Sequence, residues 1–241
     1  MDGVKSWHGS WLDGMVRIGS RVPIVALAWA LIPVGAGADE HRSALGLSVG
    51  SPGVGVTLGR SVNGHFGARV SGNFFEYRDD FREADVTYDA ALKLRSLQAL
   101  LDFHPFRSAF RLSAGVVLND NRVEGTALPT AGTLAINGRR YASEDVGTLT
   151  ARGDIGERKI ASYAGLGFGR TTGRSKMFFM LDLGVIFQGT PHVGLSATGP
   201  IASDAGFQND LAAEVIDVNR DLDEPYFQYY PVVAIGLGFR F

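Results

Sequence analysis

The sequence predicts an all-β fold, an antiparallel up-and-down transmembrane β-barrel with eight strands expected and ten as the alternative. The last segment gives the clearest observation, because its residues alternate strictly from 229 to 241. Its apolar face carries Tyr229, Pro231, Val233, Ile235, Leu237, Phe239 and Phe241. A period of two is typical of a strand, and such a face suits lipid better than water, where it would promote aggregation. Similar segments recur, separated alternately by tight turns and by long polar stretches, as in membrane barrels.

The first 38 residues are predicted to be a secretory signal peptide. Val22–Val34 is an apolar run that is shorter than the roughly 20 residues of a membrane helix. Arg17 and Arg21 precede it and Ala36-Gly37-Ala38 follows, so cleavage is expected before Asp39. Met15 is an alternative start, and an N-terminal membrane anchor is the alternative interpretation. One barrel domain over residues 39–241 remains.

The amino-acid composition limits the functions that the protein can have. The chain has 23 Lys and Arg residues against 25 Asp and Glu residues, a balance that gives no sign of nucleic-acid binding. It contains no cysteine, which excludes disulfides, thiol catalysis and cysteine-ligated metals. The histidines are few and scattered, so neither a metal site nor a cofactor is expected.

Three strands are predicted before residue 75. Their outward faces carry Leu45, Leu47 and Val49, then Val54, Val56 and Leu58, then Phe66, Ala68, Val70 and Phe74. Ser51-Pro52-Gly53 forms the turn after the first strand, and Asn63-Gly64 is a type I′ hairpin signal after the second.

The fourth strand ends at Phe103, and its apolar residues change face. Leu92 and Leu94 share one face, whereas Leu97, Ala99, Leu101 and Phe103 share the other. A bulge near Arg95-Ser96 would reconcile the two halves and would point Lys93, Arg95, Gln98 and Asp102 inward. The outward face of the fifth strand carries Phe110, Leu112, Ala114, Val116 and Leu118.

Two long polar stretches interrupt the second half of the chain. Residues 120–158 contain Asn137-Gly138 and are expected to hold their own hairpin, but their many charges leave no clean apolar face for crossing a membrane. The sixth strand turns Ala164, Leu166 and Phe168 outward, and the seventh turns Met177, Phe179, Leu181, Leu183, Val185 and Phe187 outward. Residues 189–227 then precede the terminal strand.

Residues 204–222 are predicted to form one amphipathic helix in the last outer loop. The stripe Phe207, Leu211, Val215, Val218 and Leu222 has helical spacing, Ser203 or Asp204 can cap its start, and Pro225 ends it. The helix is strongly acidic. The charged residues expected inside the barrel are mostly basic: Arg69, Lys93, Arg95, Asp102, Arg111, Asp182 and Arg240.

These opposite charges suggest two arrangements. The helix either docks over the basic barrel mouth or packs on other outer loops. An interior of eight strands is filled by side chains, so the helix is not expected to enter it. The inward charges also fit a paired structural network, because buried charge must be matched.

Two groups of residues resemble catalytic arrangements, and neither matches one well. Asp102 and His104 are spaced as a base and its orienting carboxylate, but they lie at a turn among aromatic residues that suit a membrane interface. His192 lies four residues from Ser196, with Asp182 and Glu214 as acidic candidates, and it lacks the His-x-Ser arrangement of lipid A deacylase barrels. The protein is therefore expected not to be an enzyme.

Several stretches resemble a family of small, largely uncharacterised Gram-negative outer-membrane barrels, broadly similar to the OmpA membrane domain and opacity-type barrels. They are YDAALKLRS from Tyr88, DFHPF from Asp102, FRLSAG from Phe110, FQGTP from Phe187 and YPVVAIGLGFRF from Tyr230. The ending on Val233, Ile235, Leu237, Phe239 and Phe241 resembles the signal that the barrel-assembly machinery recognises. The resemblance implies export through the periplasm with chaperones and a monomer in contact with outer-membrane lipids.

The expected function is a structural or surface-interaction role without catalysis. Two alternatives remain open. One is a narrow, porin-like, anion-favouring pore gated by the helix over 204–222. The other is an outer-membrane lipid-modifying enzyme that uses His192 and an outer-side serine.

Overall fold

The computed structural model describes residues 43–83, 86–129, 132–173 and 175–241, so the predicted leader lies outside the described residues. The strands are β1 (Ser43–Gly50), β2 (Gly53–Ser61), β3 (Phe66–Glu83), β4 (Val86–Phe103), β5 (Phe110–Asn119), β6 (Arg122–Pro129), β7 (Thr133–Ile136), β8 (Arg139–Ala142), β9 (Leu149–Asp154), β10 (Ile160–Phe168), β11 (Met177–Phe187), β12 (His192–Ala197) and β13 (Tyr229–Arg240). The helices are α2 (Ser143–Val146), η1 (Pro200–Ser203), α3 (Ala205–Leu222) and η2 (Pro225–Gln228). None of these helices is both long and apolar enough to cross a membrane.

Eight strands close into a ring in the order β1, β2, β3, β4, β5, β10, β11 and β13, and β13 pairs back onto β1. All neighbours in the ring are antiparallel. The predicted eight-stranded barrel is therefore confirmed.

The outer wall of the ring is apolar on every strand. The exposed large apolar residues include Leu45, Leu47, Val56, Leu58, Val70, Leu97, Leu101, Leu112, Val116, Leu166, Phe179, Leu183, Val233, Ile235 and Leu237. At the end with the short turns, aromatic rings meet, with Phe66 and Phe103 at 5.1 Å and Phe110 and Phe168 at 5.6 Å between ring centroids. The alternation predicted for the lipid-facing side therefore matches the observed outward residues.

The fourth strand contains no bulge. The pairing of β3 with β4 runs unbroken from Phe66 opposite Phe103 to Glu83 opposite Val86. Leu94 and Leu100 are thus both buried on the inner side, and Arg95 is exposed on the outer side. The apolar residues change face because the strand leaves one environment and enters another, and the strand itself stays regular.

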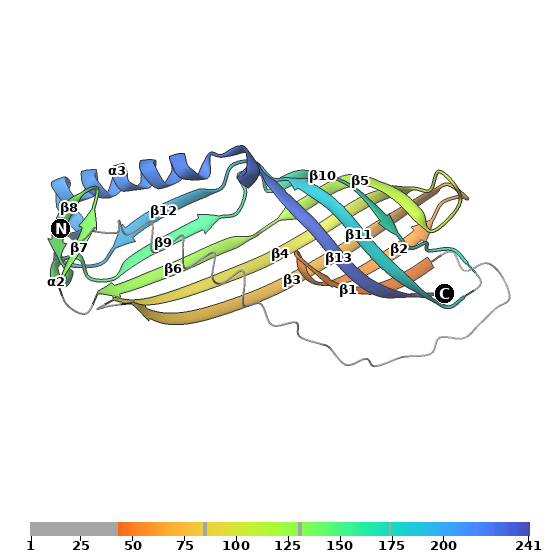
Figure 1. Ribbon diagram of the computed structural model, residues 1–241, viewed down its shortest axis with the longest axis horizontal. Coiled ribbons are helices and arrows are strands. Elements are labelled where there is room, and N and C mark those ends of the chain that lie inside the picture. Colours follow the sequence, from red (N-terminus) through yellow and green to blue (C-terminus); the bar gives the residue numbers. More distant parts are fainter. Residues whose placement is uncertain (1–42, 84–85, 130–131, 174) are drawn as a thin grey trace.

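Beyond the ring, the barrel wall continues on one side. On β4, β5 pairs with Ser96–Phe103 and β6 continues in the same register along Val86–Lys93. β9 pairs with β6, and β12 pairs with β9. We call this continuation, together with the β7–β8 hairpin, α2, η1 and α3, the extension. Figure 1 shows the extension at the end of the molecule opposite the C-terminus.

In the extension the sheet does not close into a ring, and α3 covers its inner face (Figure 1). Asp204 caps it by accepting a hydrogen bond from the Phe207 backbone N–H. Phe207, Leu211 and Val218 are buried in a core with Tyr88, Ala127, Leu134, Ile136, Val146, Leu149, Ala151 and Val193. Leu222 packs against this core, and Val215 is half-buried. The extension therefore has a hydrophobic core of its own.

Candidate functional site

The half of the barrel interior nearer the short turns holds four charged side chains, Arg69, Asp102, Arg111 and Asp182, which we call the lumen network. Arg69 Nε lies 2.6 Å from Asp102 Oδ2, and Arg111 Nη2 lies 2.8 Å from Asp182 Oδ1. Arg69 Nη2 also reaches Asp182 at 3.1 Å. Two cations face two carboxylates, which satisfies the requirement that buried charge be matched.

Neutral groups complete the lumen network. Ser113 donates to Asp102 Oδ1 at 2.6 Å, and Arg111 Nη1 donates to the backbone oxygen of Gly169 at 2.6 Å. The cavity beside these groups has a volume of only about 10 Å³, which is at the lower limit for one water molecule. The lumen is therefore filled at this level.

The other half of the interior is filled by apolar residues. Leu100, Val117, Ala161, Tyr163, Ile186 and Val232 form a buried cluster, which we call the lumen plug. The Tyr163 ring needs the space of two glycines, because a Cβ on Gly165 or Gly184 would lie 2.5 or 2.4 Å from its hydroxyl. The lumen plug therefore closes the lumen at a second level, between the lumen network and the extension.

Two residues predicted for the interior charge network lie elsewhere, and a third, Arg240, lies inside but forms no ion pair with another described residue. Lys93 and Arg95 are on the outer side, where Lys93 Nζ pairs with Glu124 at 2.9 Å and Arg95 lies 5.5 Å from the Phe74 ring centroid. The prediction that they point inward is corrected, because it depended on a bulge that the regular register excludes. Arg240 is buried, but it binds the Arg170 backbone oxygen at 2.9 Å and stacks on Phe178.

Two acidic residues of α3, Asp210 and Glu214, contact the β7–β8 hairpin and not the lumen network. Asp210 accepts hydrogen bonds from the Tyr141 hydroxyl and from Arg139 Nη1 at 3.1 Å. Glu214 accepts one from the Asn137 backbone N–H at 2.6 Å. Hydrogen bonding from Tyr141 holds the pKa of Asp210 below its ordinary value, and the same contact raises the pKa of Tyr141. The charges of α3 thus attach the helix to its own extension, which is the loop-packing alternative.

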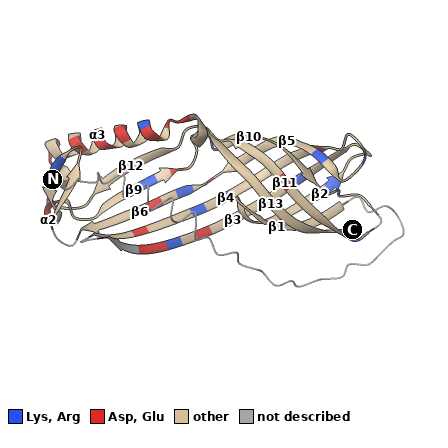
Figure 2. Ribbon diagram, in the orientation of Figure 1, with Lys and Arg blue, Asp and Glu red and all other residues tan. Residues whose placement is uncertain are grey.

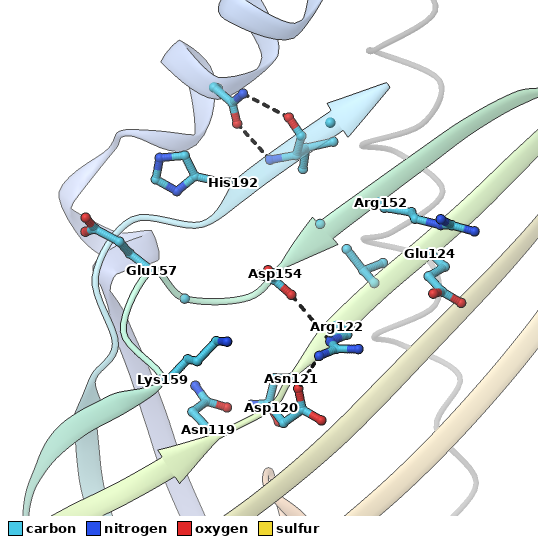
Figure 3. A pocket seen from close by; sticks show the side chains of 16 residues that line it. Asn119, Asp120, Asn121, Arg122, Glu124, Arg152, Asp154, Glu157, Lys159 and His192 are labelled. Atoms are coloured by element: carbon cyan, nitrogen blue, oxygen red, sulfur yellow. Dashed lines mark hydrogen bonds and ion pairs between the residues drawn. The ribbon is translucent and has the colours of Figure 1, made fainter. Parts of the chain in front are cut away.

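A polar cleft of about 580 Å³ lies outside, where the extension leaves the barrel. We call it the junction cleft. Figure 3 shows Arg122 between Asp120 and Asp154, and its nitrogens lie 2.8 and 3.5 Å from their carboxylate oxygens. Asn219 of α3 joins the wall of this cleft through a double hydrogen bond to the Val193 backbone, at 2.8 and 2.9 Å.

The histidine candidates have backbone partners. His192 Nδ1 lies 2.9 Å from the Thr190 oxygen, and His104 Nδ1 lies 3.0 Å from the Phe110 oxygen. Asp102 and Asp182 are engaged in the lumen network, and Glu214 is engaged by the hairpin. Among the described residues, no group of three or more potential ligands could hold a metal.

Sequence reasoning missed the residues that organise these regions. Alternation in β10 places Tyr163 inward, but its fit beside Gly165 and Gly184 depends on the neighbouring strand β11. Asn121 and Asn219 looked like ordinary loop and helix-surface residues. The Asn119-Asp120-Asn121 run was the available signal, because it separates two strands that continue in one register along β4.

No protein-family model and no curated protein sequence matches the chain. Two solved structures from Acinetobacter baumannii are similar to it. CarO2 matches with a TM-score of 0.52 and 20% identity over 84% of this chain and 100% of that chain. CarO matches with a TM-score of 0.51 and 20% identity over 83% of this chain and 98% of that chain. Both are outer-membrane β-barrel proteins, so the likeness establishes the fold of the present chain.

Proposed function

We propose that the protein is an outer-membrane barrel, closed to conduction, that presents the extension at the cell surface for interaction with other molecules and performs no catalysis. The continuous apolar outer wall supports a membrane location. The fold shared with CarO2 and CarO supports the outer membrane in particular. The predicted leader supports export.

The observation that carries the proposal is the double filling of the lumen. The lumen plug blocks the half nearer the extension, and the lumen network occupies the other half. A pore gated by α3 would need an open lumen beneath the helix, whereas α3 packs along the extension. The geometry therefore favours a closed anchor over a conducting barrel.

The extension is built as a rigid platform. Its core is apolar, its hairpin is fixed to α3 through Asp210 and Glu214, and Asn219 fixes α3 to β12. Figure 2 shows charged residues spread over α3 and the strands of the extension, whereas most of the barrel ribbon carries none. A rigid, charged surface above a closed barrel suits recognition of polar partners.

Single-channel recording in planar bilayers tests whether the barrel is closed. We expect silence from the protein and from a variant lacking residues 204–222, with heat-modifiable migration on gels showing that each is folded. A Tyr163→Gly variant, which opens the lumen plug but leaves the lumen network in place, should also be silent. Discrete anion-selective steps from the unaltered protein would refute the closed anchor and would select the pore.

Cysteine labelling on intact cells tests the orientation of the barrel in the membrane. The sequence has no native cysteine, so only the introduced cysteine can react. Ser196 is exposed on β12, and Ser108 is exposed in the turn at the opposite end. We expect a membrane-impermeant maleimide to label Ser196→Cys and not Ser108→Cys. The reverse pattern would place the extension in the periplasm.

A further inference from the structure

A groove of about 810 Å³ crosses the outer wall of the barrel over β2, β3, β4 and β5, where the extension begins. We call it the outer groove. Its apolar lining is Val54, Val56, Phe74, Leu97 and Leu118, which are 40–51% exposed.

The floor of the outer groove is formed at Gly72, which has no side chain. Val56, Gly72, Leu97 and Leu118 form one row across four strands. A Cβ built on Gly72 would have no atom within 4 Å. Gly72 therefore interrupts a continuous apolar row and leaves space that no other described part of the chain fills.

The outer groove lies at the boundary of the apolar belt. Phe74 pairs with Arg95 in the row next to Gly72, and two residues further along β3 the outward position is the exposed Glu76. On β4, Lys93 occupies the corresponding outward position opposite Glu76. In a membrane-spanning barrel this change from apolar to charged residues marks the level of the lipid head groups.

Three cations stand at the polar end of the outer groove. Arg95, Arg122 and Lys159 line it with a single carboxylate, Asp120, so the positive charge is in excess. Arg122 lies 2.8 Å from Asp120 and 3.5 Å from Asp154, so the excess positive charge comes from Arg95 and Lys159. Within the described ranges, neither Arg95 nor Lys159 takes part in an ion pair, and both are exposed.

Backbone hydrogen bonds hold these cations in place. The Asp120 N–H donates to the Arg95 oxygen at 2.9 Å, and the Arg95 N–H donates to Asn121 Oδ1 at 2.9 Å. The Asn119 N–H donates to the Lys159 oxygen at 2.8 Å. The segment between β5 and β6 thus holds the backbone of Arg95 and Lys159 beside one apolar channel.

We propose that the outer groove binds an anionic membrane lipid with a phosphorylated head group. An acyl chain lies over Gly72, between Val56 and Leu97, and the phosphate faces Arg95 and Lys159. The proposal rests on the proposed function insofar as the barrel must span a membrane. Charge excess and an apolar channel at one depth fit an anionic lipid and give no reason to bind a zwitterionic one.

Native mass spectrometry of the folded, detergent-solubilised full chain tests this site, with lipid A carrying two phosphates as the probe and phosphatidylcholine as the comparison. We expect one lipid A molecule to bind per protein, and to bind more tightly than phosphatidylcholine. Gly72→Leu fills the outer groove and should weaken lipid A binding about tenfold. Arg95→Gln with Lys159→Gln should weaken it about 25-fold, at about fivefold per cation.

Gly194→Leu is the matched control, because Gly194 is exposed on β12 and a Cβ there also meets no atom within 4 Å. It should bind lipid A as the unaltered protein does, and migration on gels verifies that every variant is folded. Equal binding by the Gly72→Leu variant, or equal affinity for phosphatidylcholine, would overturn the site. Failure of surface labelling at Ser196→Cys would instead overturn the proposed orientation and leave the lipid result to stand alone.

Discussion

Removing one charge from the lumen network should destabilise the barrel strongly. Asp182 accepts hydrogen bonds from Arg69 Nη1 and Nη2 at 3.2 and 3.1 Å, and from Arg111 Nη2 at 2.8 and 2.9 Å. Asp182→Asn keeps the shape but leaves two guanidinium groups, 5% and 2% exposed, against the single carboxylate of Asp102. An uncompensated buried charge typically costs about 3–5 kcal/mol, so we expect a loss of about 3 kcal/mol in the free energy of unfolding.

Urea unfolding in lipid vesicles, followed by the gel shift between folded and unfolded protein, measures this loss. Glu124→Gln is the control, because it breaks an ion pair to Lys93 whose side chains are 29% and 39% exposed, and such pairs contribute at most about 1 kcal/mol. Similar losses for the two variants would refute the reasoning.

A double variant separates charge imbalance from lost packing. Arg69→Met with Asp182→Leu removes one cation and one anion, so Arg111 and Asp102 remain with balanced charge. Replacing a buried ion pair with apolar residues of similar volume is often nearly neutral. The double variant should therefore recover most of the stability lost in Asp182→Asn, and no recovery would contradict the charge explanation.

Three further predictions concern other contacts. Gly184→Ala should displace the Tyr163 ring, because the new Cβ would lie 2.4 Å from its hydroxyl, at a cost of about 1–3 kcal/mol in urea unfolding; an unchanged midpoint would exclude the tight fit. Asn219→Ala should lose two hydrogen bonds to β12, each worth about 1 kcal/mol, and should speed amide exchange in that strand but not in β1. The pKa of Asp210 is held low by Tyr141, so the contact stabilises α3 fully above about pH 4 and is lost as the pH falls further. Amide exchange across 205–222, corrected for intrinsic rates, should therefore be faster at pH 3 than at pH 6, and equal corrected rates would contradict this.

The barrel could be predicted because lipid-facing strands carry a strong signal. Leu45, Leu47 and Val49 alternate with small or polar residues, and every strand of the ring carries large apolar residues at its outward positions. Of the interior charges, Arg69, Asp102, Arg111 and Asp182 could be placed by their parity alone.

The extension could not be predicted in the same way. Its strands face water on one side and a small core on the other, so the buried positions of β6 and β9 include Ala127 and Ala151, which are weak signals. Leu92 and Leu94 misled for a related reason. They lie on the inner face of β4 in the extension, where the inner face is the apolar one. A prediction that takes the apolar face of a strand to be the outer face along its whole length therefore fails where the barrel ends.

The shared register of β5 and β6 along β4 has a mechanical consequence. β3 and β4 each run for 18 residues without interruption, which is roughly 60 Å of strand, and roughly 26 Å of β4 lies alongside β6. Within the described residues, β3 and β4 pass from the ring into the extension without a break, so the extension cannot swing like a tethered domain. In the proposed membrane location, the tilt of the barrel strands would set the height and direction of the extension, and a force on the extension would pass along β4 into the barrel wall.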